Sequence, residues 1–86
     1  ALEGPAGVRS MSASTTVERV CDVLEVVLLN APISPRDIRI ATGIDKQTLS
    51  RILANLEEAG FVEETNDGAR VVGDRLRLLF DARAAR

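Results

Sequence analysis

Two short amphipathic segments joined by a turn at Gly43 constrain the fold of this chain more than any other feature. Each segment opens on a residue whose side chain can cap a helix, Ser34 in the first and Asp45 in the second. A glycine ends each segment, because glycine adopts a positive φ angle without a steric penalty. We therefore expect helices over residues 35–41 and 46–59. Two helices joined by a turn of about three residues that contains glycine form a helix-turn-helix.

Further patterns flank this pair of helices. On the N-terminal side, apolar residues at helical spacing predict a helix over residues 16–29 that buries one stripe. That stripe consists of Val17, Val20, Cys21, Leu24, Val27 and Leu28. On the C-terminal side, an Asp-Gly pair at residues 67–68 predicts a β-hairpin with strands at 61–65 and 69–72. A last helix is expected over residues 75–84.

The order of these elements predicts a winged helix-turn-helix fold: mainly α, with a three-helix core, a two-stranded wing and a C-terminal helix. The domain should span residues 15–86, since 86 residues that are 45% apolar suffice for one hydrophobic core. Residues 1–14 are rich in Gly, Ala, Ser and Pro and are expected to be disordered. Met11 indicates that residues 1–10 derive from cloning.

Composition argues against several kinds of site. The chain has no His, and Cys21 is its one cysteine, which we expect in the core. Disulfides, the usual zinc sites and Ser-His or Cys-His nucleophile pairs are therefore excluded, so no catalytic residues, metal ligands or cofactors are expected and an enzyme is disfavoured. No apolar run approaches the roughly 20 residues of a membrane span. A chain of this kind suits a reducing cytoplasm.

The third predicted helix turns its apolar residues toward the core, which leaves a polar face outward. That face consists of Lys46, Gln47, Thr48, Ser50, Arg51 and Asn55. Glutamine can pair with adenine and arginine with guanine through two hydrogen bonds each. The pattern predicts that this helix docks its N-terminal half in the major groove of double-stranded DNA.

Charge is distributed unevenly along the chain. The net charge of −2 argues mildly against a nucleic-acid partner. However, basic residues exceed acidic ones in residues 34–55 and 68–86, whereas residues 57–67 hold five acidic residues and no basic one. Affinity for phosphate depends on local contacts, so Arg36 and Arg70 are further candidates for DNA binding. Arg70 lies near the tip of the predicted wing, which is expected to contact the flanking backbone or the minor groove. Either the outward face or Arg70 could instead be ordinary solvated surface.

The last predicted helix leaves a second function open. Its apolar residues Leu76, Leu79 and Phe80 can cover the core or contact a second copy of the chain. With the acidic segment, they can also form the contact surface of a protein–protein interaction module that does not bind DNA directly.

Several segments resemble the isocitrate lyase regulator (IclR) family of bacterial transcription factors. Residues 17–25 resemble its first helix, 33–38 the entry of its second helix, and 42–62 its recognition-helix segment. Residues 72–76 resemble the passage from its wing to a linker helix. The chain departs from the family at residues 70–72, which read Arg-Val-Val where Tyr-Arg-Leu is common. MarR-like and archaeal winged-helix regulators share the same outline.

The resemblance implies a repressor or activator of transcription that acts as a homodimer on a palindromic site. Dimerisation would use the C-terminal helix or a further domain, because IclR members carry a larger C-terminal effector domain. The chain would then be the DNA-binding domain of a longer regulator or a stand-alone relative. The implied DNA contacts are Lys46, Gln47, Thr48, Ser50 and Arg51, flanked by Arg36 and Arg70.

Overall fold

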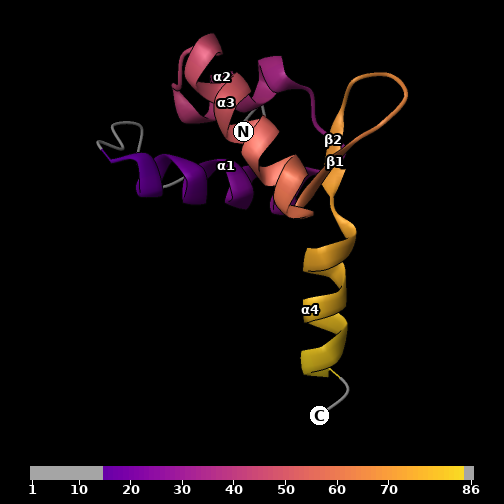
Figure 1. Ribbon diagram of the computed structural model, residues 1–86. Helices are drawn as coiled ribbons and strands as arrows, with labels where there is room; N and C mark the ends of the chain where they lie inside the picture. Colours follow the sequence, from indigo (N-terminus) through magenta and orange to yellow (C-terminus); the bar gives the residue numbers. More distant parts are fainter. Residues whose placement is uncertain (1–14, 85–86) are drawn as a thin grey trace, which may run out of the picture.

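The structure, a computed structural model, describes residues 15–84. Three helices form the core: α1 (Thr16–Asn30), α2 (Pro35–Thr42) and α3 (Lys46–Ala59). A hairpin of β1 (Val62–Glu64) and β2 (Arg70–Val72) follows, and then α4 (Asp74–Ala84), which extends away from the core (Figure 1). These elements confirm the predicted winged helix-turn-helix fold. The tail expected over residues 1–14 lies outside the described residues.

The helices begin where the sequence places capping residues. At α1, the Glu18 N–H donates to Thr15 Oγ1 at 3.0 Å, and the Thr15 N–H donates to Glu18 Oε1 at 3.2 Å. At α2, the Asp37 N–H donates to Ser34 Oγ at 3.1 Å. These side chains satisfy amide groups that have no partner within the helix. Observed and predicted helix bounds consequently agree within one residue.

The buried face of α1 differs from the predicted one. Val23 and Val26 are fully buried, whereas Val17 is 71% exposed and Cys21 is also exposed. The prediction that Cys21 is a core residue is therefore wrong. Apolar residues cover so much of α1 that two neighbouring stripes fit the helical period, and contact with α2 and β2 selects the stripe that is buried. Ile40 of α2 is 58% exposed.

The predicted stripe of α3 is confirmed. Leu49, Ile52, Leu53 and Leu56 are all buried in the core, together with Ile38 of α2. With one side of α3 fixed against the other helices, its opposite side is turned to solvent. The packing of these aliphatic side chains thus decides which residues α3 presents outward.

The wing is shorter than predicted and gains an additional backbone contact. Its strands pair antiparallel, with Val62 opposite Val72 and Glu64 opposite Arg70. Gly68 has a φ angle of 89°, which closes the loop between the strands. The Arg70 N–H donates to the Ile33 carbonyl at 2.7 Å, and the Ile33 N–H donates to the Arg70 carbonyl at 3.1 Å. The wing is thereby joined to the segment between α1 and α2.

The C-terminal helix covers the core with one residue. Leu76, in the first turn of α4, is buried, whereas Leu78, Leu79 and Phe80 are each more than half exposed. Contact with the core therefore explains why residue 76 is apolar, but it does not explain why Leu78, Leu79 and Phe80 are apolar. Among the described residues, no helix is both long enough and apolar enough to cross a membrane.

Candidate nucleic-acid interface

The outward polar residues at the start of α3 come together around one shallow groove. Its lining consists of Lys46, Gln47, Thr48, Ser50 and Arg51. Thr48 is half-buried, and the other four side chains are exposed. Because these are five of the seven residues predicted for DNA binding, the structure brings most of that set to one place.

The start of α3 is organised by Asp45. The Thr48 N–H donates to Asp45 Oδ2 at 3.0 Å, which fixes the carboxylate over the first turn. Hydrogen bonds from the Thr48 hydroxyl, and then from its backbone N–H, lower the pKa of Asp45 below its usual value. Asp45 is therefore ionised at neutral pH, and its charge lies at the positive end of the helix dipole.

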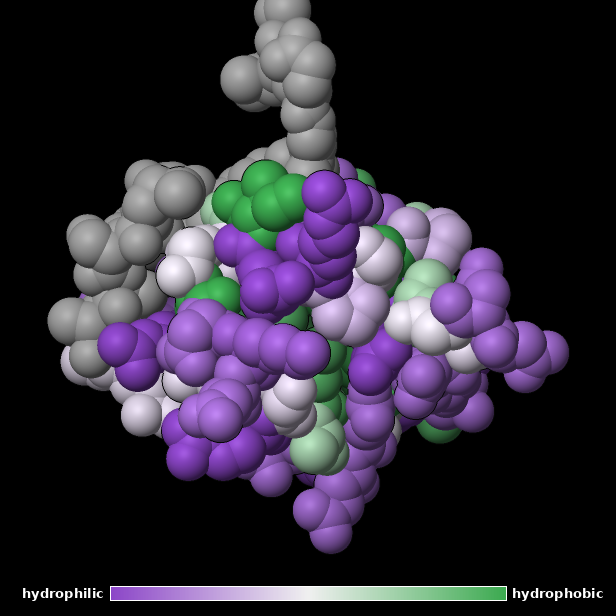
Figure 2. Space-filling view, turned by 90° about the horizontal axis from the view of Figure 1, so that it is seen from above, coloured by the Kyte–Doolittle hydropathy of each residue, from purple (hydrophilic) through white to green (hydrophobic). Residues whose placement is uncertain are grey.

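A second groove, of about 410 Å³, runs between α2, α3 and the wing. Its lining consists of Pro35, Arg36, Arg39, Lys46, Leu49, Ser50, Leu53, Ala54, Glu57 and Arg70. Lys46 and Ser50 line both grooves, so the two form one continuous surface. Viewed from the side of α2 and the start of α3, this face is largely hydrophilic (Figure 2).

Arg36 and Arg39 bring two positive charges from α2 to the second groove. Arg36, a predicted site residue, is exposed in the first turn, and Arg39 lies about one turn later. Arg39 is not among the residues that the sequence predicts to bind DNA. Its spacing of three residues from Arg36 could have revealed it, because residues three apart share a helix face.

Arg70 is placed differently from the other predicted site residues. Its side chain is 14% exposed, and its Nε lies 2.7 Å from Oε2 of Glu57. Its Nη1 donates to the Gly68 carbonyl at 2.6 Å and lies 3.6 Å from Oε2 of Glu64. The guanidinium group is thus committed to partners within the domain.

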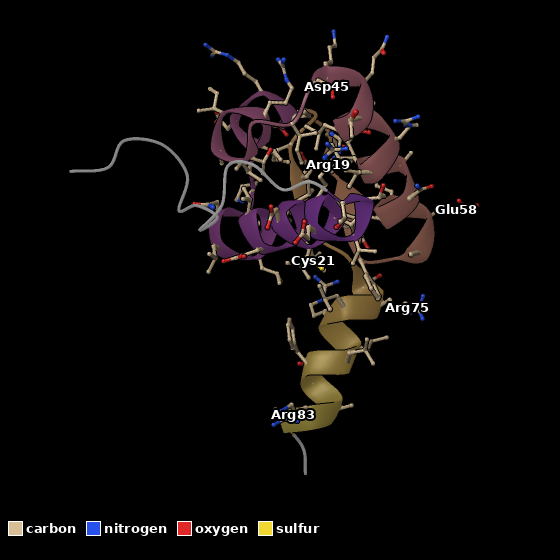
Figure 3. All side chains as sticks on the ribbon, turned by 90° about the vertical axis from the view of Figure 1, so that its left-hand side faces the viewer. Arg19, Cys21, Asp45, Glu58, Arg75 and Arg83 are labelled. Atoms are coloured by element: carbon tan, nitrogen blue, oxygen red, sulfur yellow. The ribbon has the colours of Figure 1, made fainter. Side chains whose placement is uncertain are left out.

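Charge changes sign along α3. Asp45 and the groove-lining residues lie at its start, whereas Glu58 lies exposed at its far end (Figure 3). The acidic residues Glu63 and Glu64 of β1 continue this negative end and are also exposed. A polyanion would therefore be attracted to the N-terminal half of α3 and repelled from its C-terminal end. Within residues 15–84, no group of His, Cys, Asp or Glu is arranged to hold a metal ion.

A three-helix core, an exposed polar start of the third helix and an adjoining hairpin together define a winged helix-turn-helix domain of the kind found in transcriptional regulators. The chain belongs to the MarR family, whose sequence pattern it matches over residues 13–70.

A solved structure supports the same class. The fold is similar to the crystal structure of a protein assigned as an ICLR transcriptional regulator from Silicibacter sp. TM1040, with a TM-score of 0.68 and 28% identity. The similarity covers 83% of this chain and 28% of that protein, so the chain spans less than a third of the length of this relative. A comparison with curated proteins gives no significant match.

Proposed function

We propose that this domain binds double-stranded DNA sequence-specifically as part of a transcriptional regulator. The observation that carries the proposal is the convergence of Lys46, Gln47, Thr48, Ser50 and Arg51 on one groove at the exposed start of α3. A helix so presented fits the major groove of B-DNA, with its N-terminal residues against the base edges.

The chemistry of the residues suggests a division of roles. Gln47 and Arg51 have the paired hydrogen-bonding groups that recognise adenine and guanine. Lys46 and the exposed Arg36 carry single positive charges toward the sugar-phosphate backbone. Thr48 and Ser50 offer hydroxyl groups for bases or phosphates. Arg70 flanks the second groove on the side of the wing.

The particular type of regulator we propose is IclR-like. The 28% identity to the regulator from Silicibacter, over 83% of this chain, supports this choice. By analogy, the chain would be the DNA-binding part of a protein that has further domains. This assignment is narrower than membership of the MarR family.

We further propose that the functional form is a homodimer. Large apolar residues and one cysteine remain exposed on α1 and α4, and we call this set the apolar surface: Val17, Cys21, Leu28, Leu29, Leu78, Leu79 and Phe80. Figure 3 shows Cys21 on the side of α1 toward which α4 extends. A second copy that covers this surface would remove it from water and place two α3 helices on one palindromic site.

A salt titration tests DNA binding. Duplexes selected from a random pool are labelled, and their affinity is measured by fluorescence anisotropy at increasing salt concentrations. Log affinity should fall linearly with log salt, with a slope of about −0.9 for each phosphate contact. Arg51→Ala should weaken binding at least about tenfold. Arg77→Ala, which removes the same charge from α4, should change it less than about twofold.

A protein-interaction module is the alternative function, favoured by the acidic end of α3 and by the apolar surface. NMR shift mapping with selected duplex distinguishes the two. Shifts centred on residues 45–51 support DNA docking. If no selected duplex binds at low salt, DNA binding is rejected, and shifts at 57–64 or 76–80 with a protein partner would establish the alternative.

A further inference from the structure

Arg70 connects four separate parts of the domain. Its side chain contacts Glu57 at the C-terminal half of α3, Glu64 of β1 and the carbonyl of Gly68 in the wing loop. Its backbone exchanges two hydrogen bonds with Ile33, between α1 and α2. The side chain as a whole is 14% exposed, so little of it remains available to a phosphate. The side-chain hydrogen bonds to Glu57, at 2.7 Å, and to the Gly68 carbonyl, at 2.6 Å, are short and charge-assisted, which makes them strong among hydrogen bonds.

Glu57, the ion-pair partner of Arg70, affects the net charge of the second groove. Of the described residues that line it, Glu57 is the one acidic residue, and it faces a surface that Arg36, Arg39 and Lys46 make basic. Glu57 is 30% exposed, so its charge is incompletely screened by water. Without a cationic partner, this carboxylate would oppose the approach of a polyanion. The Arg70 Nε, at 2.7 Å, supplies that partner.

We propose that Arg70 is a positioning residue, which holds the wing against α3 and neutralises Glu57 without itself contacting DNA. The proposal rests on the proposed function, because neutralisation matters only if the groove faces phosphate. It replaces the direct wing contact expected from the sequence with an indirect role through Glu57. The geometry that supports it is the commitment of Nε and Nη1 to Glu57 and Gly68.

A set of variants separates the two roles. The affinity and salt slope for a selected duplex are measured for the wild type, Arg70→Gln, Glu57→Gln and the double variant. Arg70→Gln should weaken binding about tenfold, because Glu57 is then unpaired. Glu57→Gln should stay within about threefold of the wild type. The double variant should return to within about threefold of the wild type with an unchanged slope, because the opposing charge is gone.

Arg36→Gln serves as the reference for a direct contact. Arg36 is exposed and lines the same groove. Because Arg36→Gln removes one charge that contacts phosphate, it should lower the magnitude of the salt slope by about 0.9. If the double variant stays as weak as Arg70→Gln, and its slope falls as in Arg36→Gln, then Arg70 contacts phosphate and the proposal is wrong. Arg70→Met, which keeps an unbranched aliphatic stem without the charge, replaces Arg70→Gln if the latter does not fold.

Amide hydrogen exchange tests the anchoring of the wing in the absence of DNA. The Ile33 N–H bonds to the backbone of Arg70, so it reports on the docking of β2. Arg70→Gln should reduce its protection about tenfold while the amides of the α3 interior keep theirs. Unchanged protection at Ile33 would overturn the positioning role. If the wild type binds no duplex, the proposed function fails, and this measurement still decides whether Arg70 anchors the wing.

Discussion

Gly73 packs directly against the backbone of Gly60: a Cβ atom at Gly73 would lie 2.3 Å from the Gly60 carbonyl oxygen. The Gly73 N–H donates to the Phe61 carbonyl at 2.8 Å, and the Arg75 N–H donates to the Gly60 carbonyl at 3.0 Å. The Arg75 guanidinium lies over the Phe61 ring, 5.0 Å from its centroid. The end of α3 and the start of α4 are therefore joined backbone to backbone, which fixes the direction in which α4 leaves the core.

This close approach predicts a strong effect of Gly73→Ala. The added methyl group meets backbone atoms that cannot move without breaking the junction, so the free energy of unfolding should fall by about 1–3 kcal/mol. Gly68→Ala is the control: it strains a positive φ angle but meets no atom within 4 Å, and should cost about 1 kcal/mol. Urea denaturation measures both variants. A Gly73→Ala protein as stable as the wild type would show that the junction is looser than described.

The orientation of α1 can be tested at two neighbouring positions. Val23→Ala should destabilise the domain by about 2 kcal/mol, because it empties a fully buried site. Cys21→Ser should change stability by less than about 0.5 kcal/mol, since Cys21 is exposed. Thermal unfolding followed by circular dichroism compares the two. If Cys21→Ser destabilised the domain more than Val23→Ala, the buried face of α1 would be the one that the sequence pattern predicted.

Because Asp45 caps α3, the free energy of unfolding should depend on pH in the acidic range. Because the folded-state pKa of Asp45 lies below its unfolded value of about 3.9, the ionised form stabilises the fold. This contribution is fully present above the unfolded pKa and is lost as the pH falls through the lower folded pKa. The difference in stability between the wild type and Asp45→Asn should therefore shrink as the pH falls below about 4.

Ser34→Ala is the matched control for this pH dependence. It removes the corresponding cap of α2, where the group involved does not titrate, and should cost about 1 kcal/mol at every pH. Urea denaturation at pH 6 and pH 2.5 provides the comparison. If Asp45→Asn changed the free energy of unfolding equally at both pH values, ionisation of Asp45 would not be what stabilises the cap.

The proposed dimer predicts that substitutions at two similarly exposed apolar residues differ in their effect on self-association. Phe80 of α4 is 52% exposed and belongs to the apolar surface, whereas Ile40 of α2 is 58% exposed and lies outside it. Phe80→Glu should weaken self-association at least about tenfold, because a carboxylate would be desolvated on dimerisation. Ile40→Glu should leave it unchanged. Analytical ultracentrifugation measures both, and a monomeric wild type would refute this form of the dimer.

Sequence patterns located most of the fold because its local signals agree with its packing. Helices α2 and α3 begin after the capping residues Ser34 and Asp45 and end at Gly43 and Gly60. Each of these residues acts on backbone groups close to it along the chain, so the sequence alone can reveal its effect. The stripe of α3 was likewise unambiguous, and it directed the predicted site residues outward. The α1 stripe was ambiguous because apolar residues cover most of that helix.

The sequence by itself determined the order of the elements, the helix bounds and the polar face of α3, since these depend on contacts between residues close along the chain. The tertiary structure alone decided which stripe of α1 is buried, which apolar residues of α4 stay exposed, and where the Arg70 side chain goes. Those outcomes depend on partners distant in sequence, such as Ile33 and Glu57, which no local period encodes. For the same reason, the structure pairs an arginine expected at the tip of the wing with the one acidic residue among those described around the groove.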